Sequence, residues 1–163
     1  MKSKWLIIGL LGVIVALVVA IPLAIRYSRY QEARSAVARY AIALDATLAE
    51  LRPQSLGATA LQRETGRVTS YVTLLWGRNV YVDAELLEMD VLRVRSEDPT
   101  VTAIVRERWR YVEHDRRSRE QLGDEETEDN TLRYTLLPGT DGRLAVYLSE
   151  ILEPEELQAE LEK

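Results

Sequence analysis

The strongest constraint on this chain is an uncharged apolar run, Trp5–Ile25, close to the N-terminus. A helix rises about 1.5 Å per residue, so the run would be about 31 Å long, close to the roughly 30 Å hydrocarbon core of a bilayer. Trp5 at one end and Tyr27 and Tyr30 at the other match the aromatic belts of membrane interfaces. We therefore expect one membrane-spanning helix over 5–25, after a short tail (1–4), with these anchor residues: Trp5, Leu11, Val15, Val19 and Ile25.

A cleaved signal peptide is the alternative interpretation of the same run. Lys2 and Lys4 precede it, and Val18 and Ala20 have the spacing of a cleavage site. The apolar run continues beyond Ala20 without a polar stretch, which favours an uncleaved anchor in the cell membrane. The short basic tail resembles a signal-anchor, which would place the following domain outside the cytoplasm, whereas the arginines after the run would place it inside. We expect the extracytoplasmic orientation.

Charge and cysteine content exclude several functions. Without Lys2 and Lys4 of the anchor flank, the 21 basic residues become 19, against 26 acidic residues. An acidic domain lacks the basic stripe that phosphate backbones require, so we expect no nucleic-acid partner. The chain has no cysteine, which excludes disulfides, thiolate catalysis and cysteine-ligated metal sites.

The segment after the anchor has the pattern of an amphipathic helix. Residues on one face recur every seven positions up to Pro53, which stops the helix. We expect this juxtamembrane helix, 26–53, to continue from the membrane span. Its stripe either packs on the chain's own domain, the interpretation we favour, or forms a coiled-coil seam in a homo-oligomer. The stripe residues are Tyr30, Val37, Leu44 and Leu51.

The order of the remaining elements predicts an α+β domain over 54–152. A second helix is expected over 58–76 and is followed by segments of β character with turn signals between them. A run of helices before a run of strands places the helices on one face of an antiparallel sheet. An acidic tail, 153–163, ends the chain. The expected strands are 88–95, 100–114, 131–137 and 143–151, with a charged loop at 115–130 and a hairpin turn at Asp141-Gly142.

The segments 80–115 and 130–151 resemble the late strands of the NTF2-like superfamily. The resemblance is one of element order over about 36–151, and the last strand begins Gly142-Arg143-Leu144 where many relatives carry an aromatic residue after the turn. It implies a cone of two helices packed on a curved antiparallel sheet of about four strands. Membrane-anchored domains of this type resemble accessory domains of transport, secretion and division machinery, which mostly bind proteins.

Some NTF2-like enzymes place Asp and Tyr inside the cone, so the resemblance gives a set of possible cone-lining residues. A core made of the same residues explains them equally well, and the sequence contains no motif for a cofactor. We therefore expect no catalytic residues and no cofactor. The possible lining residues are Tyr71, Asp83, Val105, Trp109 and Tyr111.

Two other candidates for chemistry are weak. His114 and Asp115 are adjacent on a strand, so their side chains point to opposite faces and do not form a general-base pair; we expect His114 on the surface. The acidic run 124–129 follows Gly123 without the spacing of a calcium loop. We expect no metal site.

Arginines alternate along the strand 100–114, opposite its apolar face. This basic face is either a solvated surface paired with glutamates or a docking surface for an acidic partner or for lipid head groups. We expect a non-catalytic, membrane-anchored accessory subunit that contacts the bilayer and other membrane proteins. The alternatives are a small-molecule-binding or enzymatic cone and a self-associating scaffold. The partner-binding hypothesis names Arg93, Arg95, Arg106, Arg108 and Arg110.

Overall fold

The computed structural model describes the backbone of residues 2–162 and the side chains of residue 18 and residues 20–162. The chain divides into two compact units, one up to Glu32 and the other from Ala33 onward. The second unit includes the helical segment Ala33–Glu50. The sequence pattern had placed this segment in a separate juxtamembrane helix, 26–53. Part of the predicted juxtamembrane helix therefore belongs to the same compact unit as the strands.

A single helix, α1 (Lys2–Glu50), runs through the predicted span and the juxtamembrane segment, as expected. It ends at Glu50, where Leu51 adopts a positive φ of 54° before Pro53. Four predicted anchor side chains lie outside the described residues: Trp5, Leu11, Val15 and Val19. Within the described residues, no helix has a stretch long and apolar enough to cross a membrane.

The stripe on α1 packs into the second unit. Val37 and Leu51 are buried and Leu44 is partly buried against the core, while Tyr30 belongs to the first unit. The stripe residues Val37, Leu44 and Leu51 are thus not available for a coiled-coil seam, because they pack in or against the core of their own domain.

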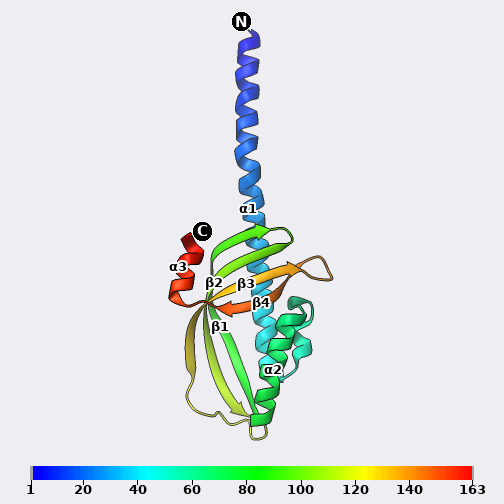
Figure 1. Cartoon of the computed structure of the whole chain (residues 1–163), viewed down its shortest axis with the longest axis vertical. Coiled ribbons are helices and arrows are strands. Elements are labelled where there is room, and N and C mark those ends of the chain that lie inside the picture. The colour runs from blue at the N-terminus through cyan, green and yellow to red at the C-terminus, as the bar shows by residue number, and fades with distance from the viewer. Residues whose placement is uncertain (1, 163) are drawn as a thin grey trace. The chain divides into compact units, whose positions relative to one another are not determined.

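Four antiparallel strands follow the helices in the order β1-β2-β3-β4 (Figure 1). The strands are β1 (Val80–Glu97), β2 (Thr100–Asp115), β3 (Glu126–Pro138) and β4 (Leu144–Ile151). Register shifts interrupt the β1–β2 pairing between Leu86 and Glu88 and between Val91 and Arg93. Such bulges bend a strand and increase its twist, which suits a sheet that curves around the helices.

Two predicted strands are longer than expected. β1 begins at Val80 rather than Glu88, and β3 begins at Glu126 inside the predicted loop 115–130. The acidic start of β3 is poor strand sequence in isolation. It pairs with β2 because carboxylates meet arginines across the strands, with Asp129 opposite Arg108.

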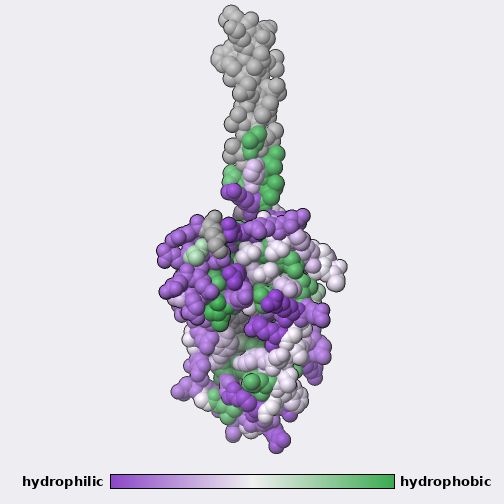
Figure 2. All heavy atoms as spheres, viewed as in Figure 1, coloured by the Kyte–Doolittle hydropathy of each residue, from purple (hydrophilic) through white to green (hydrophobic). Residues whose placement is uncertain are grey.

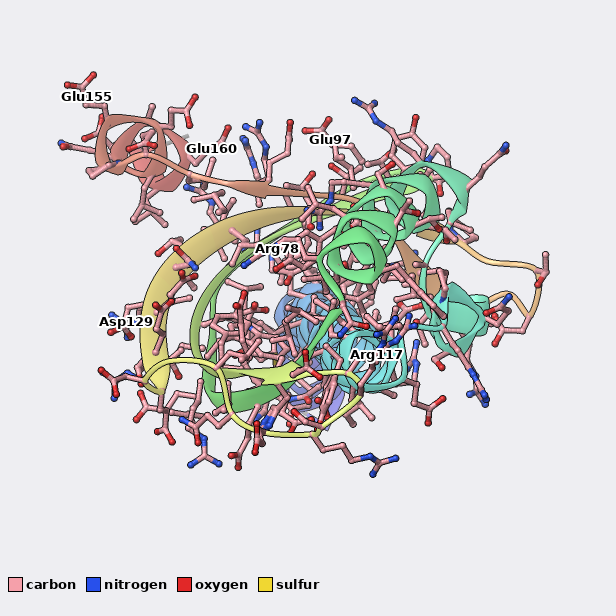
Figure 3. The ribbon with its side chains drawn as sticks, turned by 90° about the horizontal axis from the view of Figure 1, so that it is seen from below. Arg78, Glu97, Arg117, Asp129, Glu155 and Glu160 are labelled. Carbon is pink, nitrogen blue, oxygen red and sulfur yellow. The ribbon has the colours of Figure 1, made fainter. Side chains whose placement is uncertain are left out.

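The helices of the domain cover opposite faces of the sheet (Figure 3). α1 and α2 (Gln62–Arg78) lie on the concave side, where the core contains the apolar face of β2. α2 begins four residues later than predicted, because residues 53–59 form the 3₁₀ helix η1 (Pro53–Thr59) and Ala60 bridges to Val146. The predicted acidic tail is a helix, α3 (Pro154–Glu162), on the convex side.

Two adjacent leucines of α2 test this packing. Leu75 is fully buried, whereas Leu74 is 53% exposed. Leu75→Ala is expected to lower the free energy of unfolding by about 3 kcal/mol, because it removes buried methyl groups and leaves a cavity. Leu74→Ala is the matched control and should change it by less than about 0.5 kcal/mol. Urea denaturation of the full chain measures both, and equal effects would contradict the assigned helix face.

Candidate functional site

A cavity of about 640 Å³ lies between the concave face of the sheet and the two helices of the domain. Leu44 and Leu48 of α1 and Val68 of α2 form an aliphatic wall, and Leu132 of β3 closes it from the sheet. The size falls within the usual range for small-molecule sites, about 300–1,000 Å³. Two buried carboxylates, one adjoining the cavity and one within its lining, organise the polar part of this region.

The first carboxylate, Glu64 of α2, is fully buried and ties three elements together. Tyr40 of α1 donates its hydroxyl to Glu64 Oε1 at 2.5 Å, and Arg67 donates to both carboxylate oxygens at 2.6 and 3.1 Å. Ser149 of β4 donates its backbone N–H at 3.2 Å and its hydroxyl at 2.9 Å. Arg67 Nη2 also donates to Ser149 Oγ at 2.9 Å. The charge of Glu64 is therefore fully compensated inside the protein.

These contacts set the protonation state of the group. Burial acts to raise the pKa of Glu64, but the hydrogen bonds from Arg67 and Tyr40, with the charge of Arg67, outweigh it and hold that pKa below its usual 4.5. Burial and the neighbouring Glu64 charge raise the pKa of Tyr40, so its hydroxyl remains a donor. Glu64 is thus ionised, and its role is to hold α1, α2 and β4 together.

The second carboxylate, Glu107 of β2, is only 2% exposed and lines the cavity. Trp109 Nε1–H donates to Oε2 at 2.7 Å, and the Tyr134 hydroxyl donates to Oε1 at 2.8 Å. No cation is paired with Glu107 within the described residues. Burial raises the pKa of Glu107, although the two hydrogen bonds partly oppose that rise.

Aromatic rings form the wall beside Glu107. The rings of Trp109 and Tyr111, two residues apart on β2, lie 6.1 Å apart and within 10° of parallel. Tyr71 of α2 also lines the cavity. Burial, followed by the charges of Glu128 and Glu107, raises the pKa of Tyr111 to about 12. The Tyr111 hydroxyl therefore stays protonated and lies within the field of both carboxylates.

The mouth of the cavity is acidic. Glu113 of β2, Asp124 of the following loop, and Glu126 and Glu128 of β3 all belong to its lining. Glu113 forms an ion pair with Arg78 at 3.4 Å. For Asp124, Glu126 and Glu128, the described part of the chain supplies no arginine, lysine or histidine within ion-pair distance. Nor does it contain a group of three or more carboxylates or histidines placed to hold a metal ion.

The possible cone-lining residues divide into three groups. Tyr71, Trp109 and Tyr111 line the cavity, whereas Val105 is buried in the core. Asp83 points to the opposite face and lies 3.1 Å from His114 Nε2. Strand alternation explains the error, because its neighbour Val82 takes the inward position on β1.

His114 is not the freely solvated residue that we expected. Its ring stacks on Tyr81 with the centroids 4.9 Å apart, and only 18% of the side chain is exposed. His114 and Asp83 meet on the face of the sheet that points away from the cavity. His114 is therefore not part of the candidate site.

Sequence reasoning missed Glu64 and Glu107, the two carboxylates that organise this region. Glu107 lies in phase with Val105 and Trp109 on β2, so the alternation alone places it on the core face. Glu64 lies one helical turn before Val68, on the buried face of α2. In both elements, a charged residue at a position where the apolar pattern predicts burial was the signal that could have identified these glutamates.

The predicted basic surface carries paired charges. Arg93 donates to the carbonyl oxygens of Glu160 and Leu161 in α3, and Arg95 also has a partner. The β2 arginines pair with carboxylates on the convex face, where Figure 3 shows Asp129. This face is therefore a mixed, ion-paired surface. The pairs are Arg106 with Asp90 (2.9 Å), Arg108 with Asp129 (2.9 Å) and Glu88 (3.3 Å), and Arg110 with Glu85 and Glu125.

Comparison with known proteins shows similarity at the level of fold. No protein-family model and no curated protein sequence matches this chain. The intermembrane space region of the chloroplast protein ARC6 superposes with a TM-score of 0.66 at 13% identity, covering 75% of this chain and 95% of that one. The four-stranded antiparallel sheet with helices on its concave face fits an NTF2-like cone.

Two further solved structures match at lower scores. One is the protein Aln2 from a Streptomyces species, with a TM-score of 0.47 at 17% identity, covering 81% of this chain and 94% of that one. The other is an NTF2-like protein involved in plasmid conjugation, with a TM-score of 0.36 at 15% identity, covering 56% of this chain and 40% of that one.

The same substitution is expected to destabilise the domain at one buried glutamate and not at the other. Glu64→Gln should lower the free energy of unfolding by about 2 kcal/mol at pH 7, because in either orientation the buried amide nitrogen would face an Arg67 N–H that a carboxylate oxygen now accepts. The folded pKa of Glu64 is lowered, so its contribution is present above the unfolded pKa of 4.5 and disappears as pH falls through the folded pKa. Wild type and variant should converge in acid, as measured by urea denaturation across pH.

Glu107→Gln should not destabilise the domain at pH 7. The folded pKa of Glu107 is raised, so wild-type stability falls as pH rises from 4.5 through that value, and glutamine avoids this loss. The amide can accept from Trp109 and donate to Tyr134 in the same place. A variant less stable than wild type at pH 7, with a deficit that disappears in acid, would mean that the ionised form of Glu107 is compensated in the way Glu64 is.

Proposed function

We propose that this chain is a membrane-anchored, non-catalytic accessory subunit whose α+β domain binds a small ligand in the cavity of its cone. The cavity carries this proposal: about 640 Å³ of space with an aliphatic wall, stacked aromatic rings and a buried carboxylate. Convergent polar groups beside an apolar wall are typical of binding sites. In this proposal the anchor fixes the binding site near a bilayer and near other membrane proteins.

The anchor part of the proposal is supported by the apolar run and by the side chains described within it. Val18, Ile21, Leu23 and Ile25 are all more than half exposed. Figure 2 shows hydrophobic, green atoms on this helix next to the grey ones. Consecutive exposed apolar side chains are costly in water and are expected where a helix meets lipid.

Interaction with a partner protein is the second candidate function, favoured by apolar side chains on α2. Leu74 is 53% exposed and Trp76 is 52% exposed, although Arg116 lies over the Trp76 ring at 3.4 Å from its centroid. Mild extraction of the full chain, followed by mass-spectrometric identification of stoichiometric membrane subunits, tests this candidate. Loss of those subunits in Leu74→Ala would assign the contact to α2.

Arginine in the middle of the apolar run tests the anchor. Leu11→Arg with Val15→Arg is expected to release the protein from carbonate-washed membranes, because each arginine at the centre of a span costs about 2.5–3.5 kcal/mol on insertion scales. Ile42→Arg with Leu74→Arg is the matched control, since both positions are exposed in the domain, and it should stay in the membrane fraction. Retention of the first variant would refute the anchor.

Filling the cavity tests the ligand-binding part. Three probes share a 4-phenylbutyl body and carry a trimethylammonium, hydroxyl or carboxylate head. Isothermal titration of the full chain in lipid nanodiscs, against empty nanodiscs, should detect one-to-one binding of at least one probe. Leu44→Trp places an indole in the cavity and should abolish binding, whereas Ile42→Trp, at a 72% exposed position on the same helix, should not. If no probe binds above the empty discs, the ligand-binding proposal fails.

A further inference from the structure

The charges that line the cavity are strongly unbalanced. The one basic residue of the lining is Arg67, and it already forms an ion pair with Glu64. Five acidic residues share the lining with it, and only one of them has an ion-pair partner within the described residues. The cavity therefore has a negative potential, which concentrates cations at its mouth. The five are Glu107, Glu113, Asp124, Glu126 and Glu128.

Glu107 is the most deeply buried of these five acidic residues. Its two hydrogen bonds, from Trp109 and Tyr134, occupy two of the roughly four acceptor positions of a carboxylate and leave capacity free. A buried carboxylate without a counter-ion is unfavourable unless it is protonated or paired. A cation entering the cavity would supply the charge that the described part of the protein does not provide.

The aromatic wall beside Glu107 suits the same kind of group. The faces of tryptophan and tyrosine rings attract cations, and such rings are the usual receptors for quaternary ammonium groups. Trp109 and Tyr111 present nearly parallel rings on β2, next to the carboxylate, and Tyr71 adds a third ring from α2. A carboxylate beside stacked π faces favours a soft organic cation over a hydrated metal ion.

The helices give the cavity an apolar wall. Leu44, Leu48 and Val68 offer aliphatic contact to the part of a ligand away from the charge. An inorganic cation would leave this surface empty, and a purely apolar ligand would leave Glu107 without a counter-charge.

We propose that the cavity binds an organic cation, with an ammonium head on the cavity side of Glu107, beside Trp109 and Tyr111, and an apolar body against the aliphatic wall of the helices. This inference rests on the proposed function, since it names the ligand class of the same cavity. It gives the acidic mouth a role in attracting the ligand and gives Glu107 a role in holding it.

The three phenylbutyl probes test this inference, because they differ only in the charge of the head. In the full chain in nanodiscs, the trimethylammonium probe should bind at least about tenfold more tightly than the alcohol, and the carboxylate should bind most weakly. Glu107→Gln should weaken the cation by about tenfold and change the alcohol by less than about twofold. Glu88→Gln makes the same charge change on the convex face, outside the cavity, and should alter neither.

The outcomes separate the two proposals. Binding of the alcohol or the carboxylate with equal or higher affinity than the cation, lost in Leu44→Trp, would overturn the cation inference and leave ligand binding in place. Tight binding of the cation that persists in Glu107→Gln would also overturn the assigned role of Glu107. Absence of binding by all three probes would overturn both proposals.

Discussion

The Glu64 carboxylate accepts hydrogen bonds from α1, α2 and β4, and the placement of the helices against the sheet depends on these contacts. Tyr40 on α1 and Ser149 on β4 are far apart in sequence, and a single fully buried group joins them. Because a buried network stabilises a fold only when every member is satisfied, the arrangement of α1, α2 and β4 is specified closely. The aliphatic wall of the cavity is carried by the two helices that this network fixes.

The same network leads directly to the candidate site. The Tyr40 ring meets the Tyr134 ring edge-on with the centroids 6.1 Å apart, and the Tyr134 hydroxyl donates to Glu107. Arg67 thus neutralises the charge of Glu64. Glu107, on the other side of Tyr40 and Tyr134, has no cation as a partner among the described residues. The contrast separates a structural role from a binding role: Glu64 is complete inside the protein, whereas Glu107 has free capacity facing the cavity.

Alternation along the long strands decides which charges reach the cavity. On β2, Glu107 and Trp109 point inward while Arg106, Arg108 and Arg110 point outward and pair with carboxylates of the neighbouring strands and loop. The sequence pattern predicted the two faces of this strand and the order of the elements, because periods of 2 and 3.6 are local properties. It placed the start of β3 five residues late, because pairing between Asp129 and Arg108 depends on a partner strand.

The apolar run, the helix that continues from it and the α+β order can be predicted from the sequence, because they follow from local periodicity and composition. The aromatic residues that line the cavity were named on the family resemblance alone. The tertiary structure is needed to see that Glu64 meets Tyr40 and Ser149, that Asp83 faces outward and that Glu107 lies buried without a cation within the described residues. These are contacts between residues distant in the chain. The energy of a charge depends on what surrounds it, and the surroundings exist only after the helices pack on the bent sheet.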